Sequence, residues 1–355
     1  MRYELDFIGI EEHSKDADAI CFRYYDNILK RYVVVVYDGG LQKYGEALTE
    51  HLKSYYFQGE SNPTIDYVIC SHPDQDHASG LTEILHNFRV KKLIMNRPWL
   101  YIDELYNHIS DKRITPKTLE DRLKEDYPYI KALEDIANEK NIKIEEGFQG
   151  NKITSNLTIL SPSKNFYLRQ ILESHKTPLN SKSKSIKESI YSLIESWSNE
   201  LLREDVNTSP ENESSIIVLG DMESEKFLLT GDAGLLALNA AADYSESNIH
   251  DLKAVKFYQI PHHGGRHNVS TKLLNRIVGG IKPTNCTFDK TAFVSVAANS
   301  DHPRKMVTNA FIRRGVKVYE TRNKTLCHHS SDMPTREGWI NANNLAFSNK
   351  VENWE

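Results

Sequence analysis

The segment ICSHPDQDHASG, residues 69–80, concentrates side chains that bind metal ions. His72, Asp74, Asp76 and His77 place two imidazoles and two carboxylates within six positions. Alternate residues of an extended segment point the same way, so His72, Asp74 and Asp76 are expected to face one space, with His77 entering from the start of a helix. Imidazole and carboxylate groups are common ligands of divalent cations. The spacing therefore predicts a site for one or two metal ions.

A capping role is the alternative interpretation of this segment. Asp76 or Ser79 would then serve as the N-cap of the helix that follows. Four metal-capable groups in six positions are more than a cap requires, and a second histidine-bearing loop, IPHHGG at residues 260–265, favours the metal interpretation.

The elements that must position these loops are short strands and helices. Several β-branched runs lead directly into the polar motifs: VVVVY before Asp38, DYVIC before the 72–77 motif, KFLLT before Asp232, VKFYQI before PHHGG, and AFVSVAA before NSDHP; SIIVL is a further run. Helical spacing is expected at 43–56, 80–88, 117–140 with a break at Pro128, and 185–202. This alternation indicates an α/β protein. Because ligands gather at the carboxyl ends of strands in such proteins, the motifs are expected to converge.

We expect one hydrolase domain over residues 1–355, with polar or helical insertions at about 97–125 and 161–213. The second insertion has a basic first half in which one acid, Glu173, stands against six cations: Lys164, Arg169, Lys176, Lys182, Lys184 and Lys187. Such a stretch serves as a phosphate-binding arm or is a solvated face.

Composition excludes several other classes of protein. The longest aliphatic run, Val33 to Val36, is too short to cross a bilayer, and no leader pattern opens the sequence, so a cytoplasmic location and no membrane contact are expected. The four cysteines lie far apart, which argues against a disulfide framework or a zinc ribbon. A net charge of −5 argues against a protein coated in positive charge.

Taken together, the motifs resemble the metallo-β-lactamase fold superfamily. The resemblance rests on SHPDQDHASGL, LLTGD (228–232) and IPHHGG, and it extends to VYDGG, NESSIIVL and VSVAANSDHPRKMV. The pattern is most similar to the C-terminal hydrolase domain of ComEC-type DNA-uptake proteins. The resemblance implies a four-layer αβ/βα sandwich with one or two metal ions at the edge between its sheets.

The resemblance also implies roles for individual residues. His72 and Asp74 would bind one metal, Asp76 and His77 the second, and Asp232 would bridge both. His263 would complete the second site. Asp38 would be a structural or supporting residue. Without its neighbours Asp232 would be read as a turn residue, and His262 either contacts substrate or is a hydrogen-bonded loop histidine.

Two departures from the family pattern concern the metal. Asp74 stands where many members have a histidine, and the usual third histidine of the first metal has no counterpart among His86, His108, His175 and His250. Carboxylate-rich sites favour harder ions, so Mn²⁺ or Mg²⁺ competes with Zn²⁺ as the cofactor.

The expected reaction is hydrolysis by metal-activated water. Asp76 or Asp74 would orient or deprotonate that water, and His302 would donate a proton or steady a phosphate charge, unless it is only a loop histidine. His262, His302 and Asn299 are the expected substrate contacts. The favoured substrate is a phosphodiester, in DNA, RNA or a nucleotide. A lactonase, thioesterase or β-lactamase-like activity and a non-catalytic metal-containing binding module are the alternatives.

Overall fold

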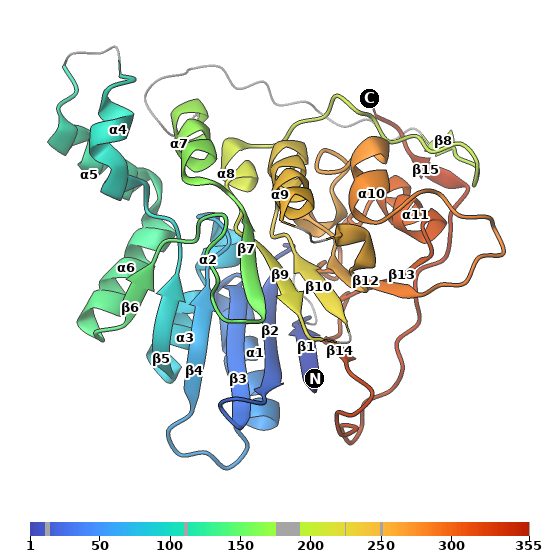
Figure 1. Cartoon of the computed structure of the whole chain (residues 1–355), viewed down its shortest axis with the longest axis horizontal. Helices are drawn as coiled ribbons and strands as arrows, with labels where there is room; N and C mark the ends of the chain where they lie inside the picture. The colour runs from blue at the N-terminus through green and yellow to red at the C-terminus, as the bar shows by residue number, and fades with distance from the viewer. Residues whose placement is uncertain (11–14, 110–112, 175–191, 224, 249–250, 355) are drawn as a thin grey trace.

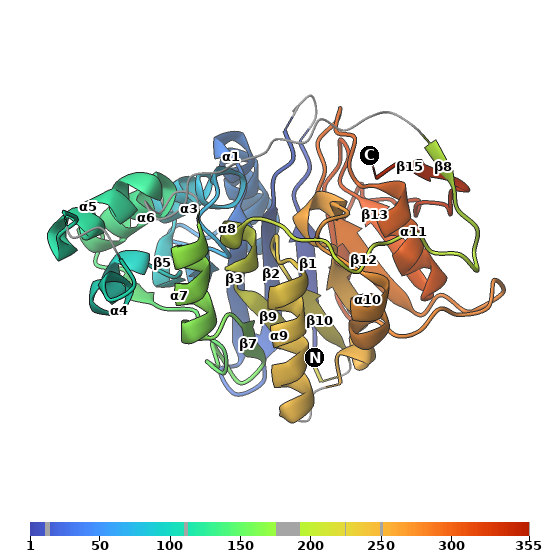
Figure 2. The ribbon, with the colours of Figure 1, turned by 90° about the horizontal axis from the view of Figure 1, so that it is seen from above.

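Two sheets pack face to face, and helices cover both outer sides (Figures 1 and 2). The computed structural model describes residues 1–10, 15–109, 113–174, 192–223, 225–248 and 251–354. The layers run helix, sheet, sheet, helix, so the predicted four-layer α/β sandwich is confirmed.

The first sheet is antiparallel on one side of β3 and parallel on the other. In spatial order its strands are β14 (Leu326–His329), β1 (Tyr3–Phe7), β2 (Ala19–Asp26), β3 (Arg31–Gly39), β4 (Thr64–Ile69), β5 (Arg89–Ile94) and β6 (Lys143–Glu145). The run Val33 to Val36 is buried on both faces of β3, which explains why this strand lacks polar alternation.

In the second sheet five strands run in one direction, and one, β9, runs antiparallel to its two neighbours. Its spatial order is β13 (Val316–Glu320), β12 (Lys290–Val294), β11 (Phe257–Gln259), β10 (Lys226–Leu229), β9 (Ile217–Asp221) and β7 (Leu157–Ser161). A separate pair joins β8 (Ser192–Ile194) to β15 (Lys350–Glu352).

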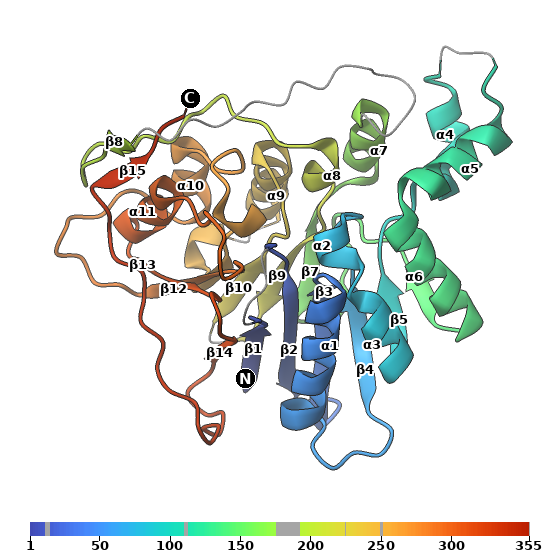
Figure 3. The ribbon, with the colours of Figure 1, turned by 180° about the vertical axis from the view of Figure 1, so that it is seen from behind.

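Helices cover the outer face of each sheet, as Figure 3 shows from behind for the first one. The first sheet is associated with α1 (Gln42–His51), the π-helical η1 (Leu52–Tyr56), α2 (Gln75–Ala78), α3 (Leu81–Asn87) and α6 (Pro128–Glu139). The second is associated with α9 (Leu235–Ser247), η3 (Leu252–Ala254), η4 (His262–Gly264), α10 (Thr271–Ile277) and α11 (Lys305–Arg313). The remaining helices are η2 (Pro98–Tyr101), α4 (Ile102–Tyr106), α5 (Pro116–Asp126), α7 (Lys164–Glu173) and α8 (Pro210–Glu213).

The predicted strands all form, and Pro128 does divide the helical stretch 117–140, into α5 and α6. The helix predicted at 185–202 is wrong where the structure describes it, because β8 and a turn occupy residues 192–199. The buried guanidinium of Arg313 binds the main-chain oxygens of Ser196, Trp197 and Asn199, and those oxygens are therefore not free for helical hydrogen bonds. Across the described residues, no helix is long and apolar enough to span a membrane.

Aromatic side chains fill the space between the sheets. The ring of Phe257 meets that of Phe293 edge to face at 4.9 Å and that of Phe7 at 5.8 Å, and it stacks on His328 at 4.6 Å. Phe7 comes from the first sheet and Phe257 from the second, so this contact fixes the distance between the sheets.

We expect Phe257→Ala to destabilise the protein by about 3–5 kcal/mol, because it leaves a cavity where the two sheets meet. Urea unfolding followed by circular dichroism measures this loss. Ile340→Ala is the control, since Ile340 is 91% exposed and should change stability by less than about 0.5 kcal/mol. A loss below about 1 kcal/mol for Phe257→Ala would show that this contact does not hold the sheets together.

Candidate metal centre

The 72–77 motif occupies the loop between β4 and α2. Asp74 stands at the N-cap position of α2, yet its side chain makes no capping hydrogen bond, and Asp76 lies in the first helical turn. Ser79 stands at the other end of the helix, where its hydroxyl donates to the main-chain oxygen of Gln75. Neither Asp76 nor Ser79 is therefore the N-cap that the capping interpretation requires.

Three buried histidines are each held through Nδ1. His77 Nδ1 lies 2.9 Å from Asp38 Oδ2, His263 Nδ1 lies 2.9 Å from the main-chain oxygen of Ser295, and His72 Nδ1 lies 3.0 Å from Ser71 Oγ. The Nε2 atoms of all three histidines are buried and have no hydrogen-bond partner. Metal-binding histidines have this pattern, in which one ring nitrogen is anchored and the other is left for the ion.

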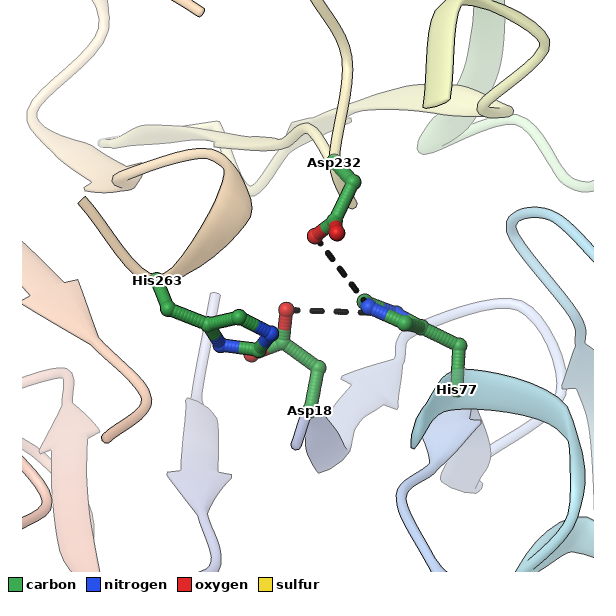
Figure 4. Close-up of side chains that lie close together, drawn as sticks. All are labelled: Asp18, His77, Asp232 and His263. Atoms are coloured by element: carbon green, nitrogen blue, oxygen red, sulfur yellow. Dashed lines mark ion pairs between the residues drawn. The ribbon is translucent and has the colours of Figure 1, made fainter. Parts of the chain in front are cut away.

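Four ligand atoms meet within 4.8 Å of one another, one from each of Asp18, His77, Asp232 and His263 (Figure 4). We call these four buried residues the tetrad. Asp232 Oδ1 is itself buried without a hydrogen-bond partner, although it lies 3.1 Å from His77 Nε2. Two nitrogens and two oxygens at this spacing match a four-coordinate divalent cation.

The two oxygens of Asp232 face different neighbours. Oδ1 faces His77 Nε2, whereas Oδ2 lies 2.9 Å from His262 Nδ1 and 4.0 Å from His72 Nε2. Asp74 Oδ2 in turn lies 3.8 Å from His72 Nε2. This arrangement suits a carboxylate that bridges two cations, the first near His72 and Asp74 and the second within the tetrad.

Asp38, near the end of β3, holds the loop after β4 in place and is not one of the tetrad residues. Its carboxylate accepts hydrogen bonds from the main-chain nitrogen (2.7 Å) and the hydroxyl (2.6 Å) of Ser71, in addition to its contact with His77. Asp38 is fully buried and has a left-handed φ of 60°. The conformation is costly for a residue other than glycine, but it turns the carboxylate toward the loop after β4.

The second histidine loop is also held in a left-handed conformation. His262, His263 and Gly264 have φ values of 50°, 52° and 81°. A Cβ atom at position 264 would lie 2.5 Å from Pro303 Cβ, so only glycine fits there. The strained backbone points His263 into the tetrad and places His262 beside Asp232.

The charges of the centre fit a divalent cation. Burial raises the pKa of Asp18 to about 6, against the pull of His263 and His77. Burial opposes protonation of His263, but Asp76, Asp232 and Asp18 raise its pKa to about 10. Within the described chain no Lys or Arg forms an ion pair with a tetrad carboxylate. Without an ion, protonated His77 and His263 offset these buried carboxylates, and a metal ion would displace those protons and supply the positive charge in their place.

A second cluster of potential ligands serves as a contrast. Asp6, Cys21 and His51 also lie close together and are buried. Both oxygens of Asp6, however, accept hydrogen bonds of 2.8 Å from Arg336, and the contacts with His51 and Arg336 hold the pKa of Asp6 below its usual range despite burial. Arg336 already neutralises this cluster, so it does not need a metal ion.

The structure brings most of the predicted site residues together. His72, Asp74, Asp76, His77, Asp232, His262 and His263 all lie at the centre, with Asp76 Oδ2 3.5 Å from His263 Nε2. Asp76 nevertheless lies outside the tetrad, where Asp18 takes the place that the sequence analysis gave to Asp76.

His302 lies at the rim of the centre. Its ring lies 6.5 Å from that of His262, and its Nδ1 lies 3.0 Å from Asp16 Oδ2, which also accepts a 2.6 Å hydrogen bond from Ser300. Arg322 fixes the same loop by donating to four of its main-chain oxygens. Asn299 is exposed on this loop, and the contacts among the described residues do not join it to the metal-binding side chains.

The sequence does not predict Asp18 as part of the centre, because ligands are expected at the carboxyl ends of strands and Asp18 lies at the amino end of one. Asp18 directly precedes β2, which runs antiparallel to β3. The amino end of β2 therefore lies beside the carboxyl ends of β3 and β4, where the other ligands gather. The sequence feature that could have indicated Asp18 is the pair of aspartates, Asp16 and Asp18, directly before a strand of the first hairpin.

The remaining predicted residues lie elsewhere. His86 and His108 are exposed, and His175 and His250 fall outside the described residues. Of the basic stretch, Lys176, Lys182, Lys184 and Lys187 also fall outside them. Lys164 is paired with Glu104 at 2.7 Å and lies 4.4 Å from the centre of the Tyr101 ring.

Comparisons with known proteins found one family model and solved structures that match this chain. Residues 33–140, which include β3, β4 and the 72–77 motif, match the family model described as the metallo-beta-lactamase superfamily. Unliganded yeast PDE1 matches at 12% identity and a TM-score of 0.41, covering 91% of this chain and 98% of that one. A beta-lactamase domain protein from Burkholderia ambifaria matches at 11% identity and a TM-score of 0.31, covering 64% of this chain and 54% of that one. No curated protein matches this chain. Over residues 33–140 the chain is thus similar to the metallo-beta-lactamase superfamily.

Proposed function

We propose that this protein is a metal-dependent phosphodiesterase. The observation that carries the proposal is the set of ligand atoms that are buried without hydrogen-bond partners: Nε2 of His72, His77 and His263, and Oδ1 of Asp232. A buried polar atom without a partner is costly, and four such atoms around one space are explained together by a bound cation.

The tetrad would hold one divalent ion, and His72 and Asp74 would hold a second, with Asp232 shared between them. A cation bound there lowers the pKa of water from about 15.7 toward about 7 and so supplies a nucleophile at neutral pH. Asp76, with Oδ2 near His263 and 34% of its side chain exposed, is placed to orient the attacking water.

The side of the centre near the second histidine loop offers hydrogen-bond donors for a phosphoryl group. The amide nitrogen of Asn212 donates to His262 Nδ1 at 2.7 Å, so that His262 Nε2 would be the donor to a phosphoryl oxygen, and the His302 ring lies beyond it. A phosphodiester carries negative charge on two non-bridging oxygens, which hydrogen-bond donors stabilise in addition to the metal. A lactone or thioester substrate carries no such charge. The sequence resemblance to the ComEC-type branch also favours a phosphodiester.

His302 is the residue we assign to protonation of the leaving group. Asp16 holds its Nδ1, which leaves Nε2 for a substrate oxygen. Asp16 thereby acts as a positioning residue, in the way that a carboxylate fixes the ring orientation of a histidine base in hydrolases.

A substrate panel tests the proposed activity. We expect hydrolysis of bis-p-nitrophenyl phosphate in the presence of Mn²⁺ or Zn²⁺, and rates at least about 100-fold lower on a lactone and a chromogenic cephalosporin, which use neither His262 nor His302 as phosphate donors. Initial rates at matched concentrations measure this preference. Faster turnover of the lactone or the cephalosporin would replace the phosphodiesterase proposal with a carbonyl hydrolase.

Metal affinity should depend on Asp38 as well as on the tetrad. His77→Ala removes a ligand and should lower bound metal, while Asp38→Asn should weaken metal binding by about 10–100-fold, because outer residues that orient a ligating histidine contribute this much. Elemental analysis and calorimetric titration with Mn²⁺ and Zn²⁺ provide the readout. His86→Ala, an exposed histidine on α3, is the matched control and should retain the wild-type metal content. Unchanged metal binding in both His77→Ala and Asp38→Asn would show that the metal does not bind at this centre.

The role of His302 predicts a dependence on the leaving group. His302→Gln should lower kcat by about 100-fold or more for a diester with an alkyl leaving group, which requires a proton. The loss should be much smaller for bis-p-nitrophenyl phosphate, since nitrophenolate departs without one. His329→Gln, an exposed histidine in β14, is the control. Equal losses on both substrates would make His302 a binding residue rather than a proton donor.

A further inference from the structure

A depression of about 500 Å³ lies at the end of the first sheet opposite the metal-binding loop. Residues 88–91, where α3 passes into β5, form one wall, and residues 140–142, where α6 passes into β6, form the other. The helices α3 and α6 lie side by side on the outer face of this sheet (Figure 3). Strands β4 and β5 are parallel, so the amino end of β5 is at the opposite end of the sheet from the loop that follows β4. The depression shares no residue with the metal centre.

Positive charge dominates the lining of this depression. Arg89, Lys91 and Lys140 are exposed there, Asn141 adds an amide, and the lining contains no carboxylate. Over the described ranges of the chain, the Arg89 guanidinium has neither an ion pair nor a hydrogen bond. Glu139, next to Lys140 in the sequence, forms no ion pair among the same residues. Arg89 therefore keeps its full charge and its five donors for a ligand.

Lys140 is held in place at the end of α3. Its Nζ donates to the main-chain oxygen of Leu85 at 2.8 Å and to that of His86 at 2.9 Å. These carbonyl oxygens orient the ammonium group and use two of its three protons, but they carry no net charge. The third proton and the positive charge are left for an anion. Because the ammonium group is already ordered, binding an anion there costs less side-chain entropy.

Lys91 shares its carboxylate partner with a second cation. Its Nζ donates to Asp66 Oδ1 at 2.7 Å, and the same carboxylate accepts two bonds of 2.8 Å from Arg31. Burial opposes ionisation of Asp66, but the hydrogen bonds from Arg31 and Lys91 hold its pKa below the usual range. One negative charge thus faces two positive charges. The group as a whole keeps one uncompensated positive charge beside the depression.

This lining selects an anion with several oxygens. A guanidinium group matches two oxygens of a phosphate group, and the two ammonium groups add charge from separate elements. A phosphomonoester carries nearly two negative charges at neutral pH, so it is attracted more strongly than a carboxylate. Small-molecule sites commonly have volumes in the range of this depression, which leaves room for an organic group beyond the phosphate. The buried side chains of Phe88, Val90 and Ile142 form its floor.

We propose that this depression is a second binding site, which takes the terminal phosphate of a small phosphomonoester. Arg89 binds two of the phosphate oxygens, and Lys140 and Lys91 supply further positive charge. The inference goes beyond the proposed function, since binding here requires neither a metal ion nor turnover. Hydrolysis of a phosphodiester by water releases an alcohol and a phosphomonoester, so one product of the proposed reaction belongs to this class of ligand.

Calorimetric titration of the full chain with inorganic phosphate, AMP and adenosine tests the inference. EDTA is present throughout, so that no ion at the metal centre binds phosphate. We expect inorganic phosphate and AMP to bind and adenosine not to bind. Arg89→Gln should weaken the binding of AMP about tenfold or more, since a hydrogen bond between charged groups contributes at least this much. Lys140→Gln should weaken it in the same direction.

Two further variants separate a specific contact from general charge. Arg89→Lys keeps the charge but loses the planar fork, so its loss of affinity should lie between those of wild type and Arg89→Gln. Arg122→Gln is the matched control, because Arg122 is an exposed arginine on α5 outside the depression, and this variant should bind AMP as wild type does. Circular dichroism confirms that each variant is folded.

Three outcomes would overturn the inference. The first is that neither inorganic phosphate nor AMP binds to the wild-type protein. The second is that folded Arg89→Gln and Lys140→Gln bind AMP within twofold of wild type, which would place the ligand elsewhere. The third is that adenosine binds as tightly as AMP, because the phosphate group would then contribute nothing. None of these outcomes depends on the reaction at the metal centre, so the two proposals fail separately.

Discussion

The carboxylate of Asp232 is buried between the two sheets, and the rest of the site is arranged around it. Its side chain is 4% exposed, and three histidines surround it: His77, His262 and His72. Burial alone would raise the pKa of Asp232, but the adjacent His77 and His262 lower it well below its usual range. The group thus stays ionised, which is the condition for a bridging metal ligand.

This constraint explains why the site needs both halves of the chain. His72 and His77 follow the first sheet, whereas Asp232, His262 and His263 follow the second. Gln259 connects them, because its side-chain oxygen accepts from the main-chain nitrogens of Thr230 and Gly231 while its nitrogen donates to Asp18 at 3.0 Å. The aromatic contacts between the sheets set the separation at which these loops meet. The packing between the sheets therefore determines the geometry of the metal centre.

Sequence reasoning succeeded where a signal was local and failed where it was not. The strands before each motif, the break at Pro128 and the 72–77 cluster are visible because β-branched runs, a proline and closely spaced ligands are local patterns. Asp18 reaches the candidate metal centre only through the antiparallel pairing of β2 with β3. The helix expected at 185–202 failed for a similar reason, because Arg313, more than a hundred residues away in sequence, binds the main chain of residues 196–199. Such tertiary contacts override local propensity.

The surroundings of the centre differ on its two sides, and this asymmetry limits how a substrate can lie. His262 and His302 lie near the second histidine loop, where their Nε2 atoms would be the donors in the proposed reaction. Asp74 and Asp76 lie on the side formed by the 72–77 motif. An anionic phosphoryl group would be stabilised toward the donors and repelled by these carboxylates. In the proposed phosphodiesterase reaction, the diester would therefore lie with its leaving oxygen near His302.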